Sequence, residues 1–300
     1  MTRPAHVLLA ALFFLGVVVP APARHTGLLP MEKVFVGRDR FDARIRQLKP
    51  IAEKVRALPI GERTAWFGQM LLGTSYKGYT LEIDDHIEAP SVNLAGLDCW
   101  TFFETALAFA RMVEEPIEEW TPETLLRCIE MDRYWGGECD GTYLSRLHYL
   151  EDWLHDNAKR GLIRDITRSL GGISVTNSAI EMTHNWKKYR YMRNNPDLRA
   201  GITDLESRLR RQPLGMIPKS RVRDIEDQLQ NGDIIGIIGR DGASYGTTHV
   251  GLAIRKDGLL YFMHASAPFN YGKVVIESRL SDYLNKHASH AGILVGRPVK

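Results

Sequence analysis

Several features that would assign a function directly are missing from this sequence of 300 residues. It has no internal repeat, no long basic run and no glycine-rich phosphate loop after a predicted strand, so nucleotide binding is not favoured. The formal net charge of +3 is too small to indicate binding to nucleic acid. Neither a Cys-x-x-Cys nor a His-x-x-x-His pair occurs, which argues against a zinc site.

An apolar run at the N-terminus is too short to span a membrane comfortably. Arg3 precedes thirteen apolar or glycine residues, Val7 to Val19, and Ala21-Pro22-Ala23 follows them. This order predicts a secretory signal peptide, residues 1–23, with an uncleaved anchor as the alternative. No cysteine precedes Cys99, so a lipoprotein anchor has no attachment site. We expect a periplasmic protein with no stable membrane insertion after cleavage.

Cysteine is scarce, with three residues in the whole chain: Cys99, Cys128 and Cys139. In an oxidising compartment an odd number leaves at least one thiol unpaired. A disulfide between Cys128 and Cys139 would leave Cys99 free, as a nucleophile must be. Two separate buried thiols are the alternative.

Hydrophobic periodicity predicts helices first and strands afterwards. The predicted helices, the first broken at Pro50, cover residues 40–58, 62–72, 99–112, 143–160 and 180–192, and a capping box at Thr203 opens another. Residues 121–211 are mainly helical in pattern. The predicted strands cover residues 233–239, 247–255, 259–265, 273–277 and 292–297, with a helix over 280–286 before the last. Helices followed by an antiparallel sheet predict an α+β fold.

Cys99 lies where a loop is predicted to give way to a helix, with Asp98 as a natural N-cap. The positive end of a helix and a nearby histidine both lower the pKa of a thiol. His249 and His264 lie on successive predicted strands, and alternation puts His249 on an open face of small residues shared with Gly251. Each of these residues alone is more typical of a structural role. Together, in this order, they have the arrangement that a cysteine amidase or peptidase needs.

An ordered set of motifs resembles the NlpC-type cell-wall cysteine peptidases: Leu72-Gly73-Thr74-Ser75-Tyr76, Asp98-Cys99, Gly232-Asp233-Ile234-Ile235, His249-Val250-Gly251 and His264-Ala265-Ser266. Further motifs resemble the N-acetylmuramoyl-L-alanine amidase-like branch of that group: Thr80-Leu81-Glu82, Asp98-Cys99-x-Thr101-Phe102-x-Glu104 and Ser145-Arg146-Leu147-His148-Tyr149-x-x-Asp152-Trp153. The similarity runs from about Val55 to Pro298. Ser75 stands where proline is common, and Trp100 where a smaller residue is usual.

The resemblance implies a papain-like fold, in which the cysteine-bearing helix lies on an antiparallel sheet that carries the histidines. It implies Cys99 as nucleophile, His249 as general base and then acid, and His264 as the residue that orients His249. Tyr76 would help to hold the oxyanion. We expect a single amidase domain over residues 24–300, with a catalytic core of 62–112 and 230–300 and a helical insertion of 113–229 that sets specificity.

Polar and aromatic residues in and near that insertion are the candidates for substrate binding. They are Arg146, His148, Tyr149, Asp152 and Glu82, with Glu104 and His184 as weaker candidates. Ordinary packing is the alternative for Tyr149 and Trp153, which have helical spacing.

The sequence therefore predicts an exported cysteine hydrolase that acts through a thioester and without metal or organic cofactor. The resemblance implies an amidase that cuts the N-acetylmuramoyl–L-alanine bond of muropeptides, with anhydro forms among the candidate substrates. The partners are peptidoglycan fragments and not nucleic acid. One alternative is an endopeptidase that cuts the γ-D-glutamyl–diaminopimelate bond. Another is a non-catalytic muropeptide-binding protein that keeps the fold. The oligomeric state does not follow from the sequence.

Overall fold

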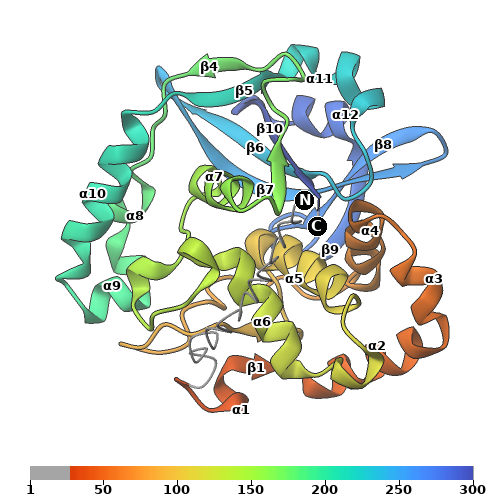
Figure 1. The fold of residues 1–300 in the computed structure, drawn as a ribbon. Coiled ribbons are helices and arrows are strands. Elements are labelled where there is room, and N and C mark those ends of the chain that lie inside the picture. The colour runs from red at the N-terminus through yellow and green to blue at the C-terminus, as the bar shows by residue number, and fades with distance from the viewer. Residues whose placement is uncertain (1–27, 300) are drawn as a thin grey trace, which may run out of the picture.

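An antiparallel sheet organises the fold of the computed structural model, which describes residues 28–299 (Figure 1). The predicted signal peptide lies outside the described residues. The sheet has eight strands in the order β4-β5-β10-β6-β7-β8-β9, and β3 also pairs with β10. Their bounds are β3 Ile163–Asp165, β4 Ile173–Val175, β5 Leu214–Pro218, β6 Ile234–Asp241, β7 Ser244–Lys256, β8 Leu259–Ala265, β9 Val274–Arg279 and β10 His290–Pro298. The five strands predicted for the last part of the chain are confirmed.

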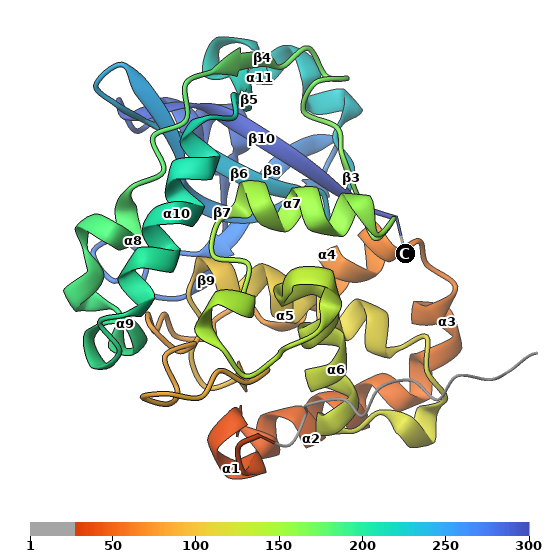
Figure 2. The same cartoon turned by 60° about the vertical axis from the view of Figure 1, so that its left-hand side comes forward.

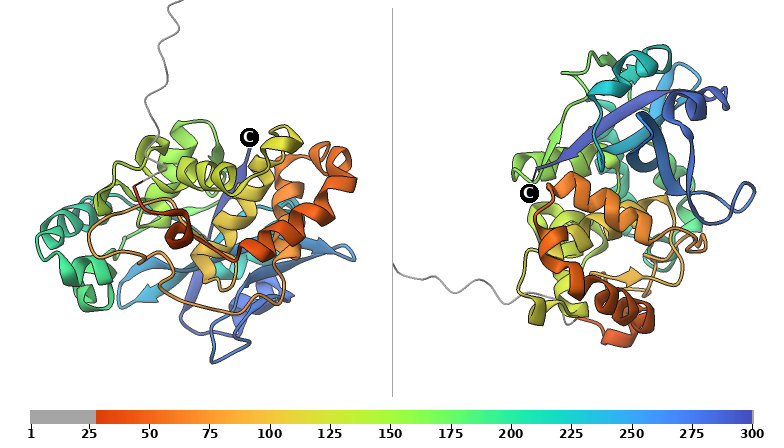
Figure 3. Two further views of the ribbon diagram at one scale, coloured as in Figure 1. Left: turned by 90° about the horizontal axis from the view of Figure 1, so that it is seen from below. Right: turned by 90° about the vertical axis from the view of Figure 1, so that its right-hand side faces the viewer.

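Helices cover both faces of this sheet. On one face lie α4 (Ile60–Met70) and α5 (Cys99–Met112), and on the other α11 (Lys219–Ile225) and α12 (Leu280–Asn285). The right-hand view of Figure 3 shows the N-terminal helices on one side of the blue C-terminal strands. Alternation along β7 explains the two layers: Val250 and Leu252 join the core under α5, whereas Ala253 joins the core under α12.

The N-terminal part follows its predicted pattern. Helix α2 (Arg38–Leu48) and helix α3 (Ala52–Arg56) are separated by a 3₁₀ turn, Lys49–Ile51, at the predicted break. Before them, α1 (Met31–Val34) leads into β1 (Phe35–Val36), which pairs in parallel with β2 (Val92–Asn93). Among residues 28–299 no helix is long and apolar enough to cross a membrane.

The middle of the chain, residues 113–229, contains strands as well as helices, whereas its sequence predicts mainly helices. It contains α6 (Pro122–Arg133), α7 (Leu150–Lys159), α8 (Glu181–His184), α9 (Arg190–Asn194) and α10 (Leu198–Arg210), but also the strands β3, β4 and β5. The views in Figures 1 and 2 place β4 and β5 at the sheet and α8 to α10 to one side of it. The segment expected as a helical insertion therefore contributes strands to the central sheet.

Three helix predictions in this segment are wrong in detail. The expected helix over 143–160 is a 3₁₀ turn, Tyr143–Ser145, then extended backbone, and then α7. The extended part is held by a β-bridge between Tyr134 and Arg146 and by the Leu147 N–H donating to the Arg133 carbonyl, 2.8 Å. Residues 180–192 form two short helices. Thr203 does not open a helix but lies inside α10, where its hydroxyl donates to the Arg199 carbonyl, 2.7 Å.

Candidate active site

Cys99 is the first residue of α5, and the local sequence fixes that start. Asp98 is the N-cap, as predicted: its carboxylate accepts from the Thr101 N–H at 2.8 Å, and the Thr101 hydroxyl accepts from the Asp98 N–H at 3.0 Å. This reciprocal pair is a capping box. Because the first N–H groups of a helix have no intrahelical partner, the N–H of Cys99 is left for a ligand.

A cavity of about 380 Å³ opens beside the Cys99 thiol. Its wall includes Tyr76 from the loop before β2, Asp98 and Trp100 around the nucleophile candidate, and residues 247–250 of β7. The same wall also includes Glu82, Arg146, His148 and Tyr149. The structure thus brings Cys99, His249 and Tyr76 to one cavity with four of the five predicted substrate-binding residues.

The two predicted histidines are in direct contact. Nε2 of His249 lies 2.7 Å from Nδ1 of His264. His264 is 2% exposed, and its own Nε2 donates to a carboxylate oxygen of Glu277 at 2.9 Å. Glu277, on β9, was missed at the sequence level. The pairing of β8 with β9 brings it to His264, and this register cannot be read from either strand alone.

The face of β7 that carries His249 is not open, contrary to the prediction. A Cβ added at Gly251 would lie 2.7 Å from the Phe262 ring, and Phe262 and His264 are in ring contact with Tyr283 of α12. Cys99 belongs to the helix on the opposite face, and both Cys99 and His249 line the cavity. A bulge shifts the pairing of β6 with β7 next to His249. Within residues 28–299 no hydrogen bond joins Cys99 to His249.

The pKa values of Cys99 and His249 do not favour the ionised thiol that a helix start and a nearby histidine would favour. Burial, and then the charge of Asp98, raise the pKa of the Cys99 thiol to about 12, although the backbone N–H groups of Val250 and Trp100 lower it in part. Burial, and then neighbouring histidines, lower the pKa of His249 to about 3. At neutral pH the site therefore holds a neutral thiol and a neutral imidazole rather than an ion pair.

Tyr76 lies at the edge of the cavity on a fixed stretch of backbone. Its N–H donates to the Gly272 carbonyl at 2.8 Å, and it forms a β-bridge with Leu97 just before the N-cap. Burial, and then the neighbouring Cys99, raise the pKa of Tyr76 to about 12. Its hydroxyl therefore keeps its proton at neutral pH and can donate a hydrogen bond.

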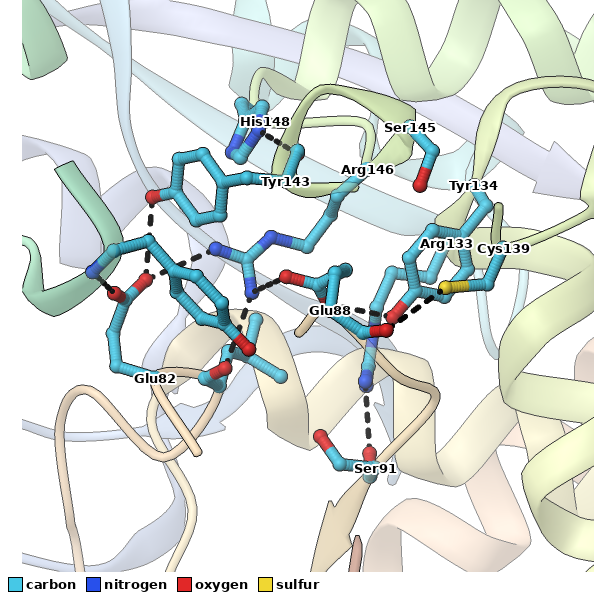
Figure 4. Close-up of polar contacts among 12 residues, drawn as sticks. Glu82, Glu88, Ser91, Arg133, Tyr134, Cys139, Tyr143, Ser145, Arg146 and His148 are labelled. Atoms are coloured by element: carbon cyan, nitrogen blue, oxygen red, sulfur yellow. Dashed lines mark hydrogen bonds and ion pairs between the residues drawn. The ribbon is translucent and has the colours of Figure 1, made fainter. Parts of the chain in front are cut away.

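A network of buried charges includes two residues of the cavity wall, Glu82 and Arg146 (Figure 4). Glu82 accepts from Arg146 at 3.0 Å, from the Tyr143 hydroxyl at 3.2 Å and from the Tyr191 N–H at 3.0 Å. Arg146 also lies 3.5 Å from Glu88, which accepts from Tyr134. Glu82 and Arg146 are thus paired with each other, so neither offers a substrate an uncompensated charge.

Of the other predicted substrate-binding residues, His148 and Tyr149 line the cavity and Asp152 does not. His148 lines the cavity, and its Nε2 donates to the Tyr143 carbonyl at 2.8 Å, so Nδ1 is the acceptor nitrogen of a neutral ring. Burial holds the pKa of His148 well below its usual range. Tyr149 lines the cavity and donates to Glu206 at 2.6 Å. Asp152 is outside the wall of this cavity, and both its oxygens accept from Arg208.

A second cavity, of about 590 Å³, adjoins the first and shares Tyr149, Glu181, Thr247 and Thr248 with it. His184 lines this second cavity. Glu104 lies instead in a buried ion pair with Arg133, 2.7 Å apart. Cys128 and Cys139 are both free and buried, so the disulfide considered from the sequence is not formed. Among the described residues no three His, Cys, Asp or Glu side chains are grouped to hold a metal ion.

Comparison with known proteins relates this geometry to one family. The AmiA-like family model, described as N-acetylmuramoyl-L-alanine amidase-like, matches residues 66–293. An N-acetylmuramoyl-L-alanine amidase from Bacteroides uniformis is 28% identical, with a TM-score of 0.71 over 80% of this chain and 99% of that chain. A Bacteroides fragilis protein, provisionally designated a xylanase, is 33% identical, with a TM-score of 0.68 over 77% of this chain and 99% of that chain.

A Legionella pneumophila protein has the same fold, with a TM-score of 0.65 at 22% identity, over 88% of this chain and 96% of that one. No curated protein matches the chain in sequence.

Proposed function

Because the chain belongs to the AmiA-like family, whose model is N-acetylmuramoyl-L-alanine amidase-like, we propose that it is a cysteine amidase of peptidoglycan fragments. It hydrolyses the amide bond between the lactyl group of N-acetylmuramic acid and L-alanine. The observation that carries the proposal is the position of Cys99 at the start of α5, in one cavity with His249, which is hydrogen-bonded to His264. The NlpC-type superfamily and a papain-like architecture belong to the same proposal, which the packing of α5 on the sheet supports.

The reaction proceeds in two halves. His249 takes the proton of the Cys99 thiol as the sulfur attacks the carbonyl carbon of the lactyl amide. The N–H of Cys99 and the hydroxyl of Tyr76 donate to the oxyanion that forms. His249 then gives its proton to the alanine nitrogen, the C–N bond breaks, and the stem peptide leaves with a free amino group. The lactyl carbonyl remains on Cys99 as a thioester.

Water completes the cycle. His249 takes a proton from water, the resulting oxygen attacks the thioester carbonyl, and the C–S bond breaks to return the thiol and release a lactyl carboxylate. A neutral imidazole is the required form of a general base, and the lowered pKa of His249 keeps it in that form. The thiol loses its proton during attack, so its raised pKa does not prevent the reaction.

The cavities favour a soluble muropeptide as substrate. The cavity beside Cys99 holds about 380 Å³ and continues into the adjoining one, which gives room for groups on both sides of the scissile bond. Tyr79, Tyr189 and Trp100 in its wall offer aromatic faces to a sugar ring. We propose that the protein acts in the periplasm, since the first 23 residues have the order of a signal peptide.

A xylanase activity, suggested by the designation of one structural relative, finds little support in the site. Glycoside hydrolysis commonly needs two available carboxyl groups on either side of the bond. Glu82 is held by Arg146, and Asp98 is held in the capping box. Among the carboxyl groups in the cavity wall this leaves Glu181, which is one carboxyl group rather than a pair.

The test is the mass of the products from purified muropeptides, in anhydro and reducing-end forms, with the protein and its Cys99→Ser variant. We expect free disaccharide and a stem that begins at L-alanine, and no cleavage by the variant. Cleavage after D-glutamate would replace the proposal with the endopeptidase. Binding without cleavage would replace it with a muropeptide-binding protein.

A further inference from the structure

A carboxylate stands behind the two histidines and is connected to the cavity through both of them. Glu277 of β9 accepts from Nε2 of His264 at 2.9 Å, and Nδ1 of His264 lies 2.7 Å from Nε2 of His249. The three residues lie on the adjacent strands β9, β8 and β7. The pairing of these strands thus positions Glu277, His264 and His249 in a row that ends at the cavity.

This line of contacts allows one assignment of ring protons. An ionised carboxylate can only accept, so Nε2 of His264 carries a hydrogen. In a neutral ring the other nitrogen, Nδ1, is then an acceptor, and it receives the Nε2 hydrogen of His249. The nitrogen of His249 that remains without a hydrogen is Nδ1. Hydrogen bonds from His264 and Lys286 lower the pKa of Glu277 to about 2, which keeps it ionised.

We propose that Glu277 is a positioning residue that fixes the tautomers of His264 and His249, and so makes Nδ1 of His249 the nitrogen that accepts the proton of Cys99. This inference rests on the proposed roles of Cys99 and His249. In the step concerned, the proton passes from Sγ to Nδ1, and the electron pair left on sulfur forms the bond to the carbonyl carbon. Glu277 stays ionised throughout and takes up no proton.

The negative charge of Glu277 also stabilises the imidazolium that forms when His249 takes up the proton of Cys99. When His249 becomes an imidazolium, its surroundings oppose the new charge: burial, His264, His290 and His287 all lower its pKa, whereas Glu277 raises it. Lys286 pairs with the other oxygen of Glu277 at 2.9 Å but is 47% exposed, so water screens its charge. The ring of Tyr283 contacts the His264 ring, and its hydroxyl stays neutral because burial raises its pKa.

The test compares Glu277→Gln with Lys286→Met, which removes the other partner of the same carboxylate from its solvent side. Histidine ¹⁵N NMR reads the tautomers, with the His249 signals assigned from their loss in His249→Gln. Alkylation of the protein by iodoacetamide reads the reactivity of the thiol, with Cys99→Ser as the blank. Thermal unfolding of each variant checks that it is folded.

We expect the wild type and Lys286→Met to show a hydrogen on Nε2 of His249. In Glu277→Gln a population with the hydrogen on Nδ1 emerges, and alkylation near neutral pH slows by about tenfold or more, as expected for loss of an oriented base. Unchanged His249 tautomers in a folded Glu277→Gln variant would overturn the inference. Neither readout uses a muropeptide, so a failure of the proposed amidase reaction is recognised separately from a failure of this assignment.

Discussion

At the scale of single residues, Cys99 is subject to opposing influences. The helix end that the sequence predicts is present, and backbone N–H groups lower the thiol pKa. Burial and the adjacent Asp98 charge raise it, and burial is the largest effect. The sequence pattern shows the helix start, which lowers the pKa of a thiol, but not the depth at which the Cys99 side chain is buried, which raises it.

The charge of Asp98 can be separated from its capping role. Asparagine caps a helix about as well as aspartate, so Asp98→Asn should keep α5 and its stability within about 0.5 kcal/mol. Loss of the negative charge should lower the pKa of Cys99. The measurement is the pH dependence of iodoacetamide alkylation, which should shift to lower pH in the variant. An unshifted profile with intact stability would mean that Asp98 does not act on the thiol.

Tyr76 allows a direct test of the proposed oxyanion donor. Tyr76→Phe removes one hydroxyl and leaves the backbone contacts of the residue to Gly272 and Leu97 in place. Loss of one donor to an oxyanion should lower kcat by roughly 10²–10³-fold, with a smaller effect on KM. Steady-state kinetics on a muropeptide measures both.

Tyr79 provides the matched control because it lies in the same loop and lines the same cavity. Its hydroxyl has no role in the proposed reaction, so Tyr79→Phe should keep kcat within a few-fold. Equal losses of kcat in the two variants would indicate a general change in the loop and would remove Tyr76 from the oxyanion site.

At the scale of secondary structure elements, several features predicted from neighbouring residues are present, although the capping box predicted at Thr203 is not. The N-cap at Asp98 and the proline break at residue 50 depend on neighbouring residues, and the structure has both. The extended segment around Arg146 depends on a bridge to Tyr134, twelve residues earlier, and on burial of Arg146 between Glu82 and Glu88. Helical spacing of its apolar residues gave no sign of those partners.

The junction of α5 with α6 depends on a buried ion pair that can be tested by its removal. Arg133 and Glu104 are 0% and 1% exposed and 2.7 Å apart. Arg133→Ala should lower the free energy of unfolding by about 3–5 kcal/mol because it leaves a buried carboxylate without its partner. Urea denaturation measures the loss. The exposed pair of Arg38 with Asp42 is the control, and Arg38→Ala should change stability by no more than about 0.5 kcal/mol.

The double variant Glu104→Leu, Arg133→Met separates the loss of pairing from the loss of packing. Replacing both charges by apolar side chains of similar size should recover much of the stability lost in Arg133→Ala. If the double variant is as unstable as the single one, the remaining contact, from Arg133 to the Ser91 carbonyl, carries the stability instead.

At the scale of the whole molecule, the candidate site could be predicted only where its residues carry their own signal. Cys99, His249 and His264 each stand in a recognisable motif, and the fold brings Cys99 and His249 to one cavity. Glu277 has no such motif, since its position follows from the pairing of β8 with β9. Asp152 has the spacing of a binding residue, but Arg208, from a distant helix, occupies both of its oxygens.

The histidines also make the stability of the whole molecule depend on pH. Burial, and then His287, lower the pKa of His290 to about 4, against about 6.5 in an unfolded chain. Between these two values the unfolded chain binds a proton that the folded protein does not. The free energy of unfolding should therefore fall as pH decreases from about 6.5 to about 4.

His290→Phe isolates this contribution, because the ring contacts to Tyr283 and His287 can persist while the titration is lost. Loss of His290 also removes one of the charges that lower the pKa of His249, and this change acts in the same direction on the difference. We expect the wild type to lose more stability than the variant across this window, measured by urea denaturation at a series of pH values. Parallel curves would mean that His290 is protonated equally in the folded and unfolded chains, and burial at the start of β10 would then not exclude its charged form.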